Sequence, residues 1–150
     1  MALREQLTEE MTKAAKSGDR PRLSTIRLLI AAVKNREIDM KRELNDEEVY
    51  QVIATMARQR RESIEQFRKG GRQDLVNKEE NELAILTSFL PPQLSRDEIV
   101  SMVREVVEEI NASGMKEMGR VMKELLPKVA GKADGKTVSD CVKEILTSKS

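Results

Sequence analysis

Apolar residues recur every three or four positions along the first forty residues, a spacing that places them on one face of an α-helix. These positions are Leu3, Leu7, Met11, Ala14 and Ala15, followed by Leu23, Ile26, Ile30 and Val33. Gly18 interrupts the pattern between the two groups. Asp19 is a favoured N-terminal cap, and Pro21 is tolerated in a first helical turn. The pattern therefore predicts one helix over about 3–16 and a second that follows Asp19 and runs to about residue 39.

The start of a third helix carries the clearest local signal. Asn45 and Glu48 have the spacing of a capping box, in which each side chain bonds the other residue's backbone N–H, and Leu44 and Val49 flank them as a hydrophobic staple. The same four-part pattern recurs at Leu94, Ser95, Glu98 and Ile99. We therefore expect helices to begin directly after Asn45 and directly after Ser95.

Glycine and proline mark the expected ends of the remaining helices. Gly70 and Gly71 end the third helix, Pro91 and Pro92 end a fourth that starts near Arg72, and Pro127 ends a short helix over about 116–126. The apolar positions expected in these helices include Val52, Ile53, Met56, Ile64 and Phe67; Leu75, Leu83, Leu86 and Leu90; and Met102, Val103, Val106, Val107 and Ile110. A loop over 128–135 then leads to a last helix that is capped by Asp134 and lined by Val138, Cys141, Val142 and Ile145.

No segment alternates apolar and polar residues as a strand would. Aromatic residues make up only 2% of the chain, and strands favour them, so the composition points the same way. The sequence therefore predicts an all-α fold. We expect an N-terminal four-helix subdomain over 1–92 and a smaller three-helix subdomain over 93–150, with the Pro91–Pro92 pair as the boundary.

Charge and cysteine content exclude several classes of protein. Lys and Arg total 27 against 26 Asp and Glu, so the net charge of +1 does not identify a partner. With no histidine and one cysteine, a disulfide framework within the chain and a His/Cys zinc site are both excluded. The first residues lack the apolar core of a signal peptide, and no apolar run is long enough to span a bilayer, so we expect a cytoplasmic protein without a membrane partner.

Candidate catalytic chemistry is sparse. The 131–137 segment ends in the Gly-Lys-Thr of a phosphate-binding loop, but Ala130 occupies the position that requires the first glycine; the 114–119 segment has the glycine spacing but lacks the following lysine. Cys141 has no histidine to activate it and falls on an apolar stripe. Adjacent acidic residues such as Glu79 and Glu80 diverge on a helix, and we interpret them as solvated. We therefore predict no catalytic residue, no metal and no cofactor.

Basic residues cluster in two places. Between residues 58 and 72, six cations face two acidic residues, and Arg61, Arg68 and Arg72 share a helical face if the helix reaches Arg72. Between residues 120 and 136, five cations face two acidic residues; they are Arg120, Lys123, Lys128, Lys132 and Lys136. Such clusters suit a phosphate backbone, and the scarcity of aromatic residues disfavours stacking on single strands. A solvated helix face is the alternative explanation.

Three blocks of the sequence resemble the YqeY family (the GatB/YqeY domain). They are 22–35; 59–67 with 71–75, 82–86 and 89–91; and 118–122 continuing through 133–136. They occur in the family's order and span nearly the whole chain. The family is similar to the C-terminal tail of the B subunit of the glutamine-dependent aspartyl/glutamyl-tRNA amidotransferase, and a related domain is attached to some glutaminyl-tRNA synthetases.

The resemblance implies a role beside tRNA. In the amidotransferase the helical tail binds the tRNA elbow while other domains and subunits perform the chemistry, so the likeness transfers binding rather than catalysis. The expected function is a tRNA-binding accessory module, with the 93–150 segment resembling the tail. The alternatives are a protein–protein adaptor for an aminoacyl-tRNA synthetase or an amidotransferase, or a component of a carbon–nitrogen ligase that uses glutamine as amido donor within an assembly.

Overall fold

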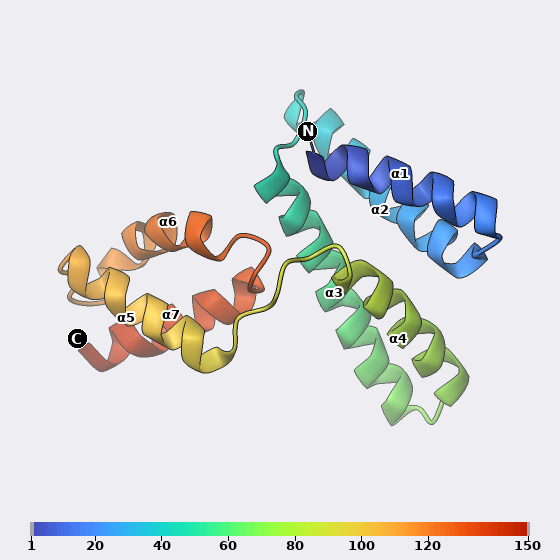
Figure 1. Cartoon of the computed structure of the whole chain (residues 1–150). Coiled ribbons are helices and arrows are strands. Elements are labelled where there is room, and N and C mark those ends of the chain that lie inside the picture. Colours follow the sequence, from blue (N-terminus) through green and yellow to red (C-terminus); the bar gives the residue numbers. More distant parts are fainter. Residues whose placement is uncertain (1, 150) are drawn as a thin grey trace. The chain divides into compact units, whose positions relative to one another are not determined.

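Residues 2–149, which the computed structural model describes, fold into helices with no strand among them (Figure 1). The helices are α1 (Ala2–Ser17), α2 (Arg20–Met40), α3 (Asp46–Lys69), α4 (Gln73–Thr87), α5 (Arg96–Glu109), α6 (Met118–Val129) and α7 (Gly135–Lys149), and a 3-10 turn over Met115–Glu117 precedes α6. The predicted all-α class is confirmed.

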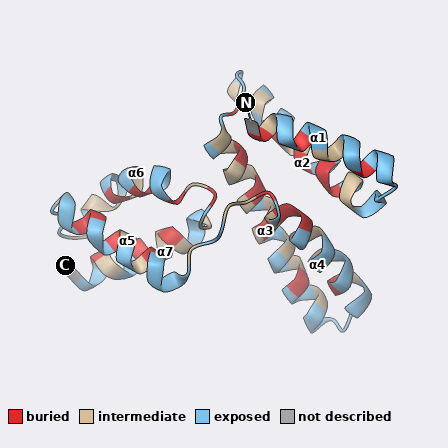
Figure 2. Ribbon diagram, in the orientation of Figure 1, coloured by how far each residue is buried: buried red, intermediate tan, exposed pale blue. Residues whose placement is uncertain are grey.

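Packing contacts divide the chain into two compact units between Leu90 and Pro91. In the first unit, α1 to α4 contribute side chains to one buried cluster, and in the second unit α5 to α7 surround another (Figure 2). The boundary expected from the proline pair lies two residues further on. Separate folding of the four-helix and three-helix parts stays a prediction.

The turn between α1 and α2 follows the expected chemistry. Gly18 has a φ of 75°, a left-handed conformation that favours glycine. Asp19 caps α2 and accepts a hydrogen bond from the Arg22 backbone N–H at 3.2 Å, with Pro21 in the first turn. Helix α2 then buries Ile26, Leu29 and its other core residues against the rest of the unit.

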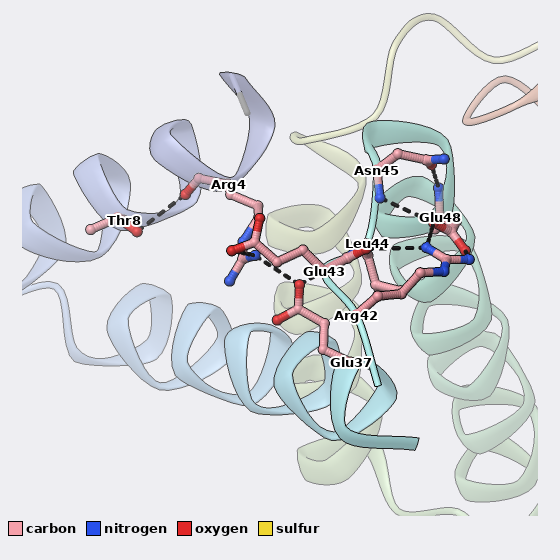
Figure 3. A network of polar contacts seen from close by, with 8 residues as sticks. All are labelled: Arg4, Thr8, Glu37, Arg42, Glu43, Leu44, Asn45 and Glu48. Atoms are coloured by element: carbon pink, nitrogen blue, oxygen red, sulfur yellow. Dashed lines mark hydrogen bonds and ion pairs between the residues drawn. The ribbon is translucent and has the colours of Figure 1, made fainter. Parts of the chain in front are cut away.

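A network of ionic contacts holds the connection between α2 and α3 (Figure 3). One carboxylate oxygen of Glu37 accepts hydrogen bonds from the Arg4 guanidinium at 2.7 Å and from the Leu44 backbone N–H at 2.9 Å. Leu44 is almost completely buried. Glu37 thus ties α1 to the segment that leads into α3.

The predicted capping box at the start of α3 is present. Asn45 accepts a hydrogen bond from the Glu48 backbone N–H at 2.9 Å, and Glu48 accepts one from the Asn45 backbone N–H at 3.1 Å. Arg42 adds a bidentate pair to Glu48, with both N–O distances at 2.7 Å. These hydrogen bonds, first that from Arg42 and then that from Asn45, lower the pKa of the Glu48 carboxyl from 4.5 to about 2.

Helix α4 differs from its prediction in its end and in its buried face. It ends at Thr87 rather than at the proline pair, and the Ser88 hydroxyl donates to the Ile85 carbonyl at 2.6 Å. A residue before proline is disfavoured in helical conformation, so the chain must leave the helix before Leu90. The buried residues of α4 are Val76, Ile85 and Leu86; the expected Leu75 and Leu83 are only half-buried.

In the second unit the predicted start of α5 is confirmed, since Ser95 and Glu98 form a complete capping box. The predicted end of α6 is wrong, because Pro127 lies inside the helix, which continues to Val129. This proline gives up its own N–H bond and crowds the carbonyl four residues earlier, but the extension of the helix buries Val129 beside Val121 and Leu125. Lys128 is accordingly helical.

Acid should weaken the cap of α3 through Glu48. Because the pKa of this carboxyl is lower in the folded chain than in the unfolded one, its stabilisation is complete above pH 4.5 and is lost as the pH falls towards 2. We expect Glu48→Gln to lower the free energy of unfolding at neutral pH and to flatten its decline between pH 4.5 and 2.

Urea unfolding followed by circular dichroism across that pH range measures this effect. Glu47→Gln is the matched control, since Glu47 is exposed in the same helical turn. Parallel pH dependences of the Glu48→Gln variant and the unaltered chain would contradict the role assigned to Glu48.

Candidate RNA-binding surface

The five cations predicted in the second unit are all exposed on α6, on the α6–α7 connection or on the first turn of α7. Their positions are set by burial: Val121, Leu125 and Val129 face the core, so Lys123 lies on the opposite side of α6. Lys132 belongs to the connection, and Lys136 to the first turn of α7. All five cations are therefore exposed to solvent.

Ion pairs within the chain separate these five cations into two groups. Arg120 pairs with Glu117 at 2.8 Å, and Lys128 lies 3.9 Å from Glu109. The remaining members are Lys123, Lys132 and Lys136, which have no ion pair with any residue of the described part of the chain. These three lysines, named the terminal lysines below, therefore have no acidic partner within the described residues that would compete with an external anion.

Backbone hydrogen bonds shape the connection that carries Lys132. Gly131 has a φ of 73°, which turns the chain after α6. The Lys132 carbonyl accepts a hydrogen bond from the Leu94 N–H at 2.8 Å, and the Gly131 carbonyl accepts one from the Gln93 side-chain amide at 2.7 Å. Segment 93–94 therefore fixes the backbone of the connection while leaving the Lys132 side chain exposed.

The α6–α7 connection resembles a phosphate-binding loop in sequence but not in structure. The element before it is α6, not a strand, and Asp134 occupies the start of α7, where its carboxylate accepts a hydrogen bond from the Lys136 N–H at 3.4 Å. A carboxylate in this place competes with a phosphate for the helix N-terminus. The alternative interpretation of this segment, a loop leading into a capped helix, agrees with this geometry.

The three cations predicted in the first unit, Arg61, Arg68 and Arg72, do not share one helical face. Helix α3 ends at Lys69, so Arg72 does not share its face with Arg61 and Arg68. Arg72 instead precedes α4 and forms two hydrogen bonds with Asp74, at 3.2 and 3.1 Å, which raise the pKa of Arg72 and lower that of Asp74. The condition set for a shared face is therefore not met, because the helix ends before Gly70 and Gly71, as predicted.

Arg68 is also neutralised, by Glu80 on α4 at 3.1 Å. Of the three predicted cations, only Arg61 is exposed without an ion pair in the described residues. This cluster therefore offers less free charge than its sequence count suggests.

Glu79 is not the solvated residue that the sequence suggested. Arg60 on α3 lies 2.8 Å from Glu82 and 3.4 Å from Glu79, and all three side chains are at least three-quarters buried. A charge withdrawn from water requires a partner, so this triad links α3 to α4. The role of this triad is structural. The sequence signal for it is a cation on one helix and acidic residues on the next helix, with a tight glycine turn between the two.

A row of cations on α2 escaped the sequence analysis altogether. Arg20, Arg27 and Lys34 are exposed, and none has an ion pair with the described residues. The signal that could have revealed them is their regular spacing of seven residues, which a count of local charge excess overlooks.

Other chemistry is limited in the described part of the chain. Cys141 is buried in the second-unit core, as its apolar stripe predicted. No group of three potential metal ligands is found among residues 2–149, and no helix there has the length and apolar character to cross a membrane. The fold and its surfaces define an all-helical protein, and exposed cations without an ion pair in the described residues include those on α2, Arg61 on α3 and the three terminal lysines.

Comparison with known proteins assigns the chain to a family. The family model described as Yqey-like protein matches residues 4–146, and the chain belongs to this family. The resemblance found in the sequence blocks is confirmed.

Its relatives include fungal proteins named "Altered inheritance of mitochondria protein 41, mitochondrial". That of Kluyveromyces lactis is 35% identical over 135 residues, which cover 88% of this chain and 69% of the relative. That of Pyrenophora tritici-repentis is 29% identical over 147 residues, covering 96% and 81%, and that of Lachancea thermotolerans is 34% identical over 110 residues, covering 71% and 59%. The name places those proteins in mitochondria.

Replacement of Arg60 by Met should destabilise the first unit. The change leaves two mostly buried carboxylates without their counter-charge, and we expect the free energy of unfolding to fall by about 1–3 kcal/mol. Urea unfolding measures the change, with Arg61→Met as control because Arg61 is exposed one residue away on the same helix. Equal stabilities of the two variants would show that the triad does not stabilise the fold.

Proposed function

We propose that the chain is a tRNA-binding accessory module whose second unit contacts the RNA backbone through Lys123, Lys132 and Lys136. The observation that carries the proposal is that these three lysines are exposed and unpaired around one connection. They fall in the last sequence block shared with the family, and that block resembles the amidotransferase tail. Family membership supports the link without establishing the ligand.

The kind of contact follows from the residue types. Lysine ammonium groups bind phosphates as point charges and do not read base sequence. The aromatic residues are three in number, and Phe89 is buried while Tyr50 and Phe67 are half-buried. Stacking on exposed bases therefore contributes little, and the outside of a folded RNA is the ligand that the surface fits best.

Binding rather than chemistry is proposed for the chain by itself. In the described residues we identify no exposed nucleophile with a general base beside it near the terminal lysines. The one thiol, that of Cys141, is buried. An aminoacyl-tRNA synthetase or an amidotransferase is the enzyme class that would use such a module. The proposal applies in the cytosol expected from the sequence and in the mitochondrion named for the relatives, because tRNA is present in both.

Reversal of the terminal lysines tests the proposal. We expect the triple change Lys123→Glu, Lys132→Glu and Lys136→Glu to weaken binding to bulk tRNA by at least about tenfold at low salt, because three phosphate contacts become repulsive. Electrophoretic titration of the purified chain measures the change.

The matched control reverses three lysines that are exposed elsewhere: Lys16, Lys78 and Lys143. If both triple variants lose affinity equally, the terminal lysines are not a specific contact surface. If the unaltered chain does not bind tRNA at low salt but retains a protein partner after nuclease treatment, the chain is an adaptor and the proposal is wrong.

A further inference from the structure

Helix α2 carries a straight row of three exposed cations. Arg20, Arg27 and Lys34 are seven residues apart, close to two helical turns, so they share one face. At 1.5 Å per residue, neighbours in the row are about 10.5 Å apart and its ends about 21 Å apart. We name these three residues the α2 ridge.

The fold keeps the ridge in solvent. The buried residues of α2 are Thr25, Ile26, Leu29 and Val33. From the turn of 100° per residue, the centre of the ridge lies roughly 145° round the helix from the centre of that buried stripe. The packing of α2 therefore determines which side faces outward, and Arg20, Arg27 and Lys34 lie on this side.

No carboxylate neutralises the ridge. None of its members pairs with the described residues, whereas Arg22 on the same helix is engaged by Glu10 at 3.1 Å and lies over the Phe89 ring at 5.3 Å. Of the two acidic residues of α2, Glu37 is occupied by Arg4. Asp39 points roughly 120° away from the ridge around the helix.

Two hollows along the ridge are free of acidic groups. An open groove of about 460 Å³ is lined by Arg20, Leu23, Ser24, Arg27 and Leu28. Two of its lining residues are arginines and one is a serine, and guanidinium and hydroxyl groups are donors suited to a phosphodiester oxygen. A second hollow, of about 220 Å³, lies beside Lys34 and is lined by residues of α1 and α2, among them Thr8 and Met11, with no carboxylate.

We propose that the α2 ridge binds the sugar-phosphate backbone of a double-helical RNA segment. The inference rests on the proposed function, which gives RNA as the class of ligand. It adds a second contact surface in the first unit of the chain, whereas the terminal lysines lie in the second unit. A straight helix with cations along one side matches the backbone of an RNA duplex, whose recognition depends on shape and phosphate contacts rather than on bases.

Two other polyanionic surfaces fit the ridge less well. An interfacial helix binds a membrane by immersing its apolar face, but that face of α2 is buried in the protein core. A single-stranded nucleic acid requires aromatic side chains for stacking, and α2 has none. The duplex is therefore the ligand that the charge pattern favours.

The test uses the full chain with a 20-base-pair RNA duplex of mixed sequence as the probe. We expect the triple change Arg20→Glu, Arg27→Glu and Lys34→Glu to weaken duplex binding by at least about tenfold at low salt. The variant Arg20→Gln, Arg27→Gln and Lys34→Gln should lose less affinity and lower the dependence of log Kobs on log salt by about 2–3, since each lost phosphate contact removes about 0.9. Circular dichroism establishes that each variant is folded.

The control reverses Lys16, Lys78 and Lys143, as above. Duplex affinities of the ridge variants equal to that of this control would overturn the inference. The inference would also be overturned if the ridge variants lost binding to vesicles of phosphatidylcholine and phosphatidylserine but kept duplex binding, because the ridge would then bind lipid. A stronger effect on a single strand of equal length would also overturn it.

The two proposals fail in different ways. If the terminal-lysine variant loses tRNA and the ridge variants do not, the ridge inference alone is wrong. If the unaltered chain binds neither tRNA nor duplex at low salt, the proposed function is wrong and the ridge inference falls with it.

Discussion

Each helix of this chain can bury only one narrow apolar stripe, and the remaining features of the molecule depend on that constraint. In α6 the burial of Val121 and Leu125 turns Lys123 outward, and in α2 the burial of Ile26 and Leu29 turns the ridge outward. The core residues thus determine where charge can meet a partner.

Ion pairs then decide which of the exposed cations are available. Arg68 and Arg72 looked as favourable in sequence as Lys132, yet acidic side chains of α4 neutralise them. The terminal lysines and the α2 ridge have no such partners in the described residues. The net charge of +1 therefore conceals an uneven distribution, in which some cations pair with acidic residues and others have no ion pair in the described residues.

Local signals in the sequence predicted the local structure well. The capping boxes at Asn45 and Ser95 were identified because both partners lie three residues apart. The errors at Pro127 and in the buried face of α4 arose where packing outweighed a local rule, since burial of Val129 extends α6 past a proline. The pairing of Arg68 with Glu80 was beyond reach, because it depends on how α4 folds back against α3. The ridge was predictable from its spacing of seven and was missed because only charge excess was counted.

The salt dependence of tRNA binding by the unaltered chain tests the central claim most directly, namely that unpaired surface cations bind an RNA backbone. With three terminal lysines and three ridge cations in contact, a plot of log Kobs against log salt should have a slope of about −5, and with one surface alone about −3. Affinity that does not change with salt, or no binding at low salt, would contradict the account.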